Sequence, residues 1–376
     1  MKVTYLFLVI FSLSYSSLFA APTFDKAVWI PYWRKTEGAS STLLNLNKLT
    51  QISPFAFELQ QDGSIKNALK FEEEPWTTLI REAKKKKIKI YPSILSYPHN
   101  ETEKYNFYLL MAQRSKRAAH VKEIVALVKK YNVDGVDIDY EAKTAETRPY
   151  FSAFLTELAK ELHKNKKQLI CTVEARTPPD SRYATTSTEI LARVEYANDY
   201  KAIGKACDQV RIMAYDQSTD DAKLVIQNKQ SGSLYTPVAD LEWVKKVVIV
   251  AMWDIPAKKI IIGVPTYGSK YEVITTATST RTRRIGSMNF NYADELAKSL
   301  SITPTRNIAG ELSFVYSTST DSNGNPLESY KQYLVWYSDA KSIEDKIKIA
   351  KMYKLGGVAV FKVDGGNDPN LWNVLR

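Results

Sequence analysis

Three acidic side chains occupy alternate positions of one short segment, Asp137, Asp139 and Glu141, among the apolar residues Val136 and Ile138. Because successive side chains of a β-strand point to opposite faces, a strand here would place all three carboxyl groups on one face. Carboxyl groups this close cannot all ionise without a large cost, so at least one is expected to have a raised pKa. A raised carboxyl pKa is what a general acid needs near neutral pH. The segment therefore predicts acid–base chemistry.

A polar edge strand or a Ca²⁺-binding loop would also concentrate acidic residues. The flanking valine and isoleucine instead argue for a strand that is covered on both faces, as in a parallel sheet. The spacing also lacks the central glycine and the terminal glutamate of an EF-hand loop. Both alternatives are therefore disfavoured.

The rest of the chain supplies elements that could hold such a strand. From about residue 27 onward, β-rich runs alternate with helical stretches whose apolar residues recur at i, i+3, i+4 and i+7. This alternation predicts repeated βα units, and 376 residues suit one large α/β domain, a (β/α)8 TIM barrel. The expected strands are 27–33, 54–59, 88–95, 133–140, 169–174, 209–215, 260–265 and 357–363. The expected helices include 76–86, 118–130, 149–164, 241–252 and 343–353.

The interval from about 268 to 331 interrupts this alternation. It contains Thr-, Ser- and Arg-rich stretches, a helical signal at 292–300, and a hairpin signal at 312–316 followed by the turn-forming segment 321–325. We expect a small α+β insertion between the last two strands. The barrel with this insertion is expected to span residues 21–376.

Residues 1–20 are typical of a secretory signal peptide. Lys2 precedes an apolar stretch, and small residues precede Pro22, near which cleavage is expected. The apolar stretch is too short to predict a membrane span, although an uncleaved anchor is the alternative. We therefore expect a secreted protein, extracellular, periplasmic or associated with a cell wall.

The formal net charge of +11 bears on the partners of the protein. A basic secreted protein can associate with anionic cell-wall polymers through long-range electrostatics. Nucleic acid is disfavoured as a partner, because the lysine runs lie on expected helices and not among the aromatic residues of a binding module. We expect a monomer.

Cysteine and histidine are scarce, with 2 and 3 residues. Cys171 and Cys207 lie in apolar stretches of neighbouring expected strands, so a buried disulfide and two buried free thiols both fit, with free thiols favoured. No Cys/His pattern of a metal site is present, and histidine catalysis has little material. No metal and no cofactor are expected.

The carboxylate segment matches the D-G-x-D-x-D-x-E signature of glycoside hydrolase family 18, which includes chitinases and chitinase-like proteins. It reads Asp134-Gly135-Val136-Asp137-Ile138-Asp139-Tyr140-Glu141. A second segment resembles the motif of that family's sixth strand and falls on the sixth expected strand here. It reads Met213-Ala214-Tyr215-Asp216. The resemblance spans about residues 27–376, and the interrupted interval lies where many members carry a small insertion.

The resemblance implies a retaining glycosidase in which the substrate's own N-acetyl group is the nucleophile, an exception to the two-carboxylate scheme. Glu141 would protonate the glycosidic oxygen and then act as the base toward water. Asp139 would hold the acetamido group, Asp137 would share a proton with Asp139, and Tyr215 would hydrogen-bond the acetamido oxygen. The substrate would be a glycan that contains N-acetylglucosamine, and chitin oligosaccharides, peptidoglycan and N-glycan cores all stay open.

A saccharide groove is expected near the strand ends, although core packing is the alternative for each aromatic residue and for Met213, and loop capping for Asp216. Phe361 stands where the family usually has a tryptophan beneath the reacting sugar, and 95–97 reads Leu-Ser-Tyr where Gly-Gly-Trp is common. These departures argue against crystalline chitin as substrate more than against catalysis. The groove candidates are Met213, Asp216, Phe361, Tyr32, Phe57, Tyr97, Tyr267 and Trp336, with Trp29, Trp33 and Glu174.

Two non-enzymatic alternatives remain. A chitinase-like lectin would bind sugar without cleaving it, but the acid Glu141 is present, which favours the enzyme. A structural or inhibitory barrel could use the basic residues Arg281, Arg283 and Arg284 of the insertion, although these arginines could equally be solvated.

Overall fold

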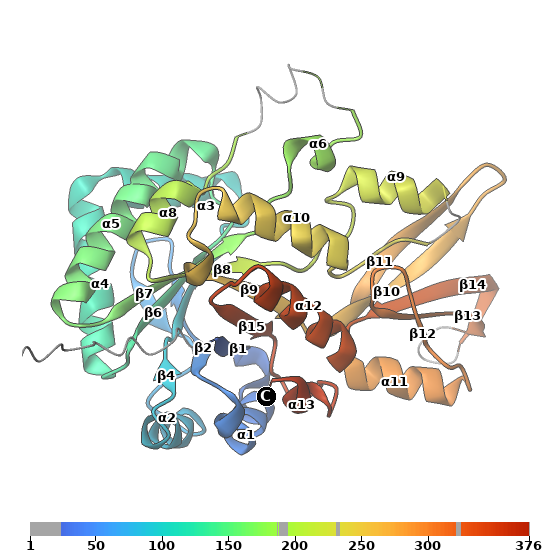
Figure 1. Cartoon of the computed structure of the whole chain (residues 1–376), viewed down its shortest axis with the longest axis horizontal. Coiled ribbons are helices and arrows are strands. Elements are labelled where there is room, and N and C mark those ends of the chain that lie inside the picture. Colours follow the sequence, from blue (N-terminus) through green and yellow to red (C-terminus); the bar gives the residue numbers. More distant parts are fainter. Residues whose placement is uncertain (1–23, 186, 188–194, 231–233, 321–324, 376) are drawn as a thin grey trace, which may run out of the picture.

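The computed structural model describes residues 24–185, 187, 195–230, 234–320 and 325–375 (Figure 1). The expected signal peptide and most of the expected turn at 321–325 lie outside the described residues. Eight parallel strands close into a barrel, which confirms the predicted fold class. In spatial order they are β1 Asp25–Ile30, β2 Gln51–Leu59, β5 Ser93–Ser96, β6 Gly135–Tyr140, β7 Gln168–Glu174, β8 Gln209–Met213, β9 Ile260–Pro265 and β15 Gly357–Phe361. β3 Ile65–Asn67 and β4 Lys89–Ile90 also pair with β2.

Helices surround the barrel (Figure 1). α5 shows why these segments are helical: its buried side chains recur every three or four residues, and Pro149 lies in its first turn, where a missing N–H costs nothing. The α-helices outside the second sheet are α1 Lys35–Leu44, α2 Trp76–Lys85, α3 Glu101–Ala112, α4 Arg114–Lys130, α5 Arg148–Lys164, α6 Pro179–Arg182, α8 Tyr200–Ala206, α9 Ala222–Gln230, α10 Leu241–Met252, α12 Ala340–Met352 and α13 Leu371–Val374.

The third barrel strand differs from the prediction, because the expected run 88–95 is divided into β4 and β5. Pro92 lies between the two strands, and proline has no N–H to donate to a neighbouring strand. The chain stays beside β2 through the break, since the Tyr91 amide donates to the Ile52 carbonyl at 3.0 Å. β5 then ends at Ser96, directly before Tyr97.

A second, antiparallel sheet follows β9 and lies beside the barrel (Figure 1). Its strands are β10 Tyr267–Thr275, β11 Thr280–Asn289, β12 Thr305–Arg306, β13 Leu312–Thr320 and β14 Pro326–Tyr337. α11 Phe290–Ser299 packs on it through Ala293 and Ala297, which share a small core with Phe314 and Val335. The sheet returns the chain to α12, so it extends past residue 331 to Tyr337.

The two cysteines form a disulfide, which corrects the favoured expectation of free thiols. Cys171 lies in β7 and Cys207 directly follows α8, with their Cα atoms 6.1 Å apart. Both residues are buried in the layer between barrel and helices. In the sequence, the apolar residues around both cysteines are compatible with a disulfide and with two free thiols. Only the distance between the two Cα atoms in the folded chain distinguishes these two states.

A helix must be both long and apolar to cross a membrane, and none of the helices in the described ranges meets both conditions.

Candidate active site

The three carboxyl groups lie along β6, which pairs with β5 on one side and β7 on the other. Asp137 and Asp139 are buried, with 0% and 5% of their surface exposed. Glu141 directly follows the strand, and its amide donates to the Ser96 carbonyl at 2.8 Å. Glu141 is therefore the carboxyl nearest the mouth, at the carboxyl ends of the strands where barrel enzymes carry their active sites.

Asp137, the deepest carboxyl, is enclosed by four donors. Its Oδ2 accepts from Trp29 Nε1 at 2.9 Å, Ser93 Oγ at 2.8 Å and Arg211 Nη1 at 3.2 Å. Its Oδ1 accepts from Thr172 Oγ1 at 2.8 Å. Asp137 is thus surrounded by donors from four other strands, and the sharing of a proton with Asp139 stays a prediction.

Asp139 and Glu141 have environments that favour their protonated forms. Burial, followed by the charges of Glu141, Asp137 and Glu174, raises the pKa of Asp139 well above its usual value. Burial also raises the pKa of Glu141 to about 7, with Glu174 raising it further and Lys143 opposing. Asp139 Oδ1 is buried and has no hydrogen-bond partner among the described residues. An unpaired buried acceptor is costly and marks a place where a ligand could donate.

Tyr215 and Phe361 form the aromatic floor of the site. Their rings stack with centroids 4.9 Å apart and planes inclined by 14°. Burial raises the pKa of Tyr215 well above its usual value, and the charges of Asp139 and Glu141 add to that shift. The hydroxyl is therefore a donor at neutral pH.

Above these groups lies a cavity of about 290 Å³, into which both Asp139 and Glu141 open. Six of the groove candidates line it, namely Tyr32, Trp33, Tyr97, Met213, Asp216 and Phe361. Sequence reasoning missed Phe55, Leu95 and Ser96, which also line it. Phe55 carried a signal, because it occupies an expected strand two residues before Phe57, at the same face by simple alternation.

Phe57 and Trp336 correct the predicted groove, because both lie in the core. Phe57 is 1% exposed and packs against Phe71 and Tyr131. The pairing of β2 with β5 shifts register between Phe55 and Phe57, so the irregularity sends the two rings to different environments. Trp336, on β14, is 2% exposed and donates its Nε1 to Glu311.

Three other groove candidates do not line the cavity but interact with residues of the site. Trp29 is buried inside the barrel and donates to Asp137. Tyr267 is buried, and its hydroxyl donates to Asp216 Oδ1 at 2.7 Å. Glu174 accepts from Asn198 and acts on the site through its charge.

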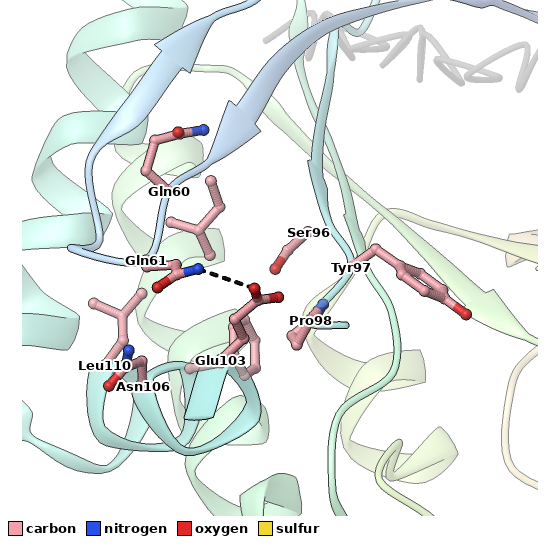
Figure 2. A pocket seen from close by; sticks show the side chains of 10 residues that line it. Gln60, Gln61, Ser96, Tyr97, Pro98, Glu103, Asn106 and Leu110 are labelled. Atoms are coloured by element: carbon pink, nitrogen blue, oxygen red, sulfur yellow. Dashed lines mark hydrogen bonds between the residues drawn. The ribbon is translucent and has the colours of Figure 1, made fainter. Parts of the chain in front are cut away.

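A smaller cavity of about 70 Å³ adjoins the catalytic one, since Ser96 and Tyr97 line both. Gln61 Nε2 donates to Glu103 Oε1 at 3.0 Å within it. Figure 2 shows the Tyr97 ring pointing away from this hydrogen bond. Tyr97 therefore separates the small cavity from the catalytic one.

Within the described ranges, no set of three or more His, Cys, Asp or Glu side chains is arranged to hold a metal ion.

The chain resembles known proteins over most of its length. The family described as glycosyl hydrolases family 18 matches residues 28–366. YvbX of Bacillus subtilis (strain 168), described as an uncharacterized glycosylase, is 27% identical over 351 residues, covering 91% of this chain and 89% of that protein. The spore cortex-lytic enzyme SleL of Bacillus megaterium QM B1551 has a TM-score of 0.71 at 22% identity, over 94% of this chain and 73% of that chain. A chitinase from Cycas revoluta in complex with (GlcNAc)3 has a TM-score of 0.69 at 18% identity, over 93% and 98%.

Proposed function

Because the chain belongs to glycosyl hydrolase family 18, we propose that it cleaves β-linked glycans containing N-acetylglucosamine, with retention and by substrate-assisted catalysis. The observation that carries this proposal is the pairing of two groups at one cavity. Glu141 has a pKa raised to about 7, and beside it Asp139 has a buried oxygen to which no described residue donates. An acid and a free acceptor side by side are what protonation of a leaving group and capture of an acetamido N–H require.

The proposed reaction has two steps. Glu141 gives its proton to the glycosidic oxygen while the acetamido carbonyl oxygen attacks C1, so the C1–O bond breaks and an oxazolinium forms. Asp139 accepts the acetamido N–H, and the Tyr215 hydroxyl donates to the acetamido oxygen. Water then attacks C1, Glu141 takes a proton from it, and the ring opens to the product with its original configuration.

Replacing Glu141 by Gln tests this acid directly. The substitution keeps the shape and removes the transferable proton, so turnover of a chitooligosaccharide should fall by about 10²–10⁴-fold, the range for general acid catalysis. Binding of the oligosaccharide should change little. A wild-type protein that binds such oligosaccharides and shows no more turnover than Glu141→Gln, on all three candidate glycans, would overturn the proposal in favour of a lectin.

Asp139→Asn supplies a second test with a matched control on the same segment. Turnover should fall, because a neutral amide cannot stabilise the developing oxazolinium charge. Asp134→Asn is the control, since Asp134 accepts from the Ile90 amide at 3.0 Å and from Lys89 outside the cavity. That variant should act on stability and keep its turnover.

The substrate's acetamido group is the proposed nucleophile, so its removal is decisive. A chitooligosaccharide should be cleaved to a β-configured product, whereas the fully deacetylated oligosaccharide should resist cleavage. Equal turnover of both would mean that a protein carboxylate is the nucleophile. Mass-spectrometric digests of chitooligosaccharides, peptidoglycan glycan strands and N-glycoproteins would identify the preferred polymer.

We also propose that the protein is secreted after loss of its N-terminal segment and associates with anionic cell-wall polymers. The disulfide between Cys171 and Cys207 supports export, because such bridges persist in oxidising compartments. Sequencing of the protein recovered from its host should find a terminus near Ala21 or Pro22. Recovery of an intact Met1 would contradict export by cleavage.

A further inference from the structure

A cavity of about 280 Å³ continues the catalytic cavity toward the second sheet. Asp216 lines both cavities. The remaining lining comes from two regions, the segments after β8 and the paired strands β10 and β11. These residues are Ser218, Pro237, Val238, Ser269, Tyr271 and Arg284. The two cavities therefore adjoin at Asp216, and Arg284 lies in the second of them.

Arg284 is the basic residue of this extension, and it is held in place without an acidic partner. Its Nε donates to Ser269 Oγ at 3.0 Å and its Nη2 donates to Ser287 Oγ at 2.7 Å. In the described parts of the chain no carboxylate forms an ion pair with it, whereas its neighbour Arg283 pairs with Glu272. A guanidinium has five donors, so two hydroxyl contacts leave Nη1 and part of Nη2 available.

Asp216 is the acidic residue of the extension, and it does not neutralise Arg284. Its Oδ1 accepts the Tyr267 hydroxyl at 2.7 Å. Desolvation raises the pKa of Asp216, while the Tyr267 hydrogen bond and the charge of Arg284 act to lower it. The positive charge of Arg284 therefore acts on Asp216, which lies where the two cavities meet.

We propose that Arg284 binds a carboxylate carried by the glycan, the 3-O-lactyl carboxylate of N-acetylmuramic acid, which is free where the stem peptide has been removed, and so adapts this site to peptidoglycan strands without stem peptides. A guanidinium fork matches a carboxylate with two parallel hydrogen bonds, and charge-assisted bonds of this kind are stronger than bonds to a sugar hydroxyl. Chitin carries only hydroxyl groups at the corresponding position. This inference rests on the proposed function, because it specifies the glycan that the same site accepts.

The test compares three substrates and three proteins. The substrates are glycan strands that alternate N-acetylglucosamine and N-acetylmuramic acid, the same strands with each lactyl carboxyl converted to a neutral amide, and a chitooligosaccharide. The proteins are the wild type, Arg284→Gln and the control Arg281→Gln. Arg281 lies on the same strand, is exposed and does not line the cavity.

For Arg284→Gln, the ratio of kcat/KM on the muramic strands to kcat/KM on the chitooligosaccharide should fall roughly 10- to 100-fold, mainly through KM, as expected for loss of a charge-assisted hydrogen bond. Arg281→Gln should keep the wild-type ratio. Amidation of the strands should lower the ratio for the wild type in the same way, and this comparison needs no variant to fold.

Several outcomes would overturn the inference. An equal loss on all three substrates would mean that Arg284 only shapes the groove or binds hydroxyl groups, and an unchanged ratio would mean that no carboxylate reaches it. A wild type that cleaves the chitooligosaccharide but not the muramic strands would overturn the inference and leave the proposed function standing. Cleavage of none of the three would overturn the inference, and the digest of N-glycoproteins would then decide the proposed function.

Discussion

The guanidinium of Arg211 lies 3.2 Å from Oδ2 of Asp137, and neither side chain has any exposed surface. Arg211 reaches across the barrel from β8 to β6, and its Nη1 and Nη2 also donate to Ser53 at 2.6 Å and Gln51 at 2.9 Å. A buried charge pair of this kind persists only when additional hydrogen bonds satisfy it. The pair fixes the deep end of the carboxylate row, whereas Asp139 and Glu141 line the cavity.

Arg211→Gln should destabilise the fold by about 3–5 kcal/mol, because it leaves the Asp137 carboxylate buried without its cation. Urea unfolding of the wild type and the variant measures the difference. The double variant Arg211→Gln/Asp137→Asn provides the control, since it removes both charges. Its loss should be clearly smaller than the sum of the two single losses, and simple additivity would show that the pair is not coupled.

Hydrolysis should decline as the pH rises through about 7, because Glu141, the proposed acid, can give a proton only while it holds one. The charge of Glu174 raises the pKa of both Asp139 and Glu141. Glu174→Gln should therefore move the high-pH limb of kcat/KM to lower pH, by up to about one unit.

The control for that experiment is Glu161→Gln. Glu161 lies on α5, where its carboxylate pairs with Lys164 at 2.6 Å on the outer surface. The high-pH limb of kcat/KM for Glu161→Gln should stay at the wild-type pH. If Glu174→Gln leaves the limb in place as well, Glu174 does not act on the acid through its charge.

Glu141 should also reduce stability at alkaline pH. Its pKa is about 7 in the folded protein and near 4.5 in the unfolded chain. Between these values only the folded state holds the proton, so stability is full below about pH 4.5 and is lost as the pH rises through about 7. Glu141→Gln, which cannot ionise, should therefore be more stable than the wild type at pH 8. The difference measured by urea unfolding should shrink as the pH falls toward 4.5, and a difference that does not vary with pH would contradict this linkage.

The barrel and its carboxylate row could be predicted from sequence because both depend on local periodicity. Alternation along β6 places Asp137 and Asp139 on one face, and Glu141, directly after the strand, continues the same alternation. The recurring apolar positions of α5 likewise require no knowledge of the partner strand. Each of these patterns can be recognised within a single segment of the chain, without reference to a distant one.

The parts that escaped prediction depend on contacts between distant segments. Arg211 stands in an apolar strand, and that unusual place was a signal, but its partner Asp137 lies 74 positions away. The register shift in β2 separates Phe55, which lines the cavity, from Phe57, which was expected in the groove and lies in the core, and no residue type between them indicates a bulge. The Cys171–Cys207 bridge likewise depends on how closely α8 approaches β7.

Gly263 gives room to Tyr215, and its replacement tests whether that ring must lie where it does. A Cβ at Gly263 on β9 would lie 2.7 Å from Cε1 of Tyr215 and 3.0 Å from the Ile212 carbonyl oxygen, so the ring would have to move. Gly263→Ala should cost about 1–3 kcal/mol of stability through overpacking, and it should lower kcat more than it raises KM. Gly286→Ala is the matched control, because a Cβ there meets nothing within 4 Å. Urea unfolding and steady-state kinetics of both variants make the comparison, and a Gly263→Ala enzyme with wild-type kcat would show that catalysis tolerates a displaced Tyr215.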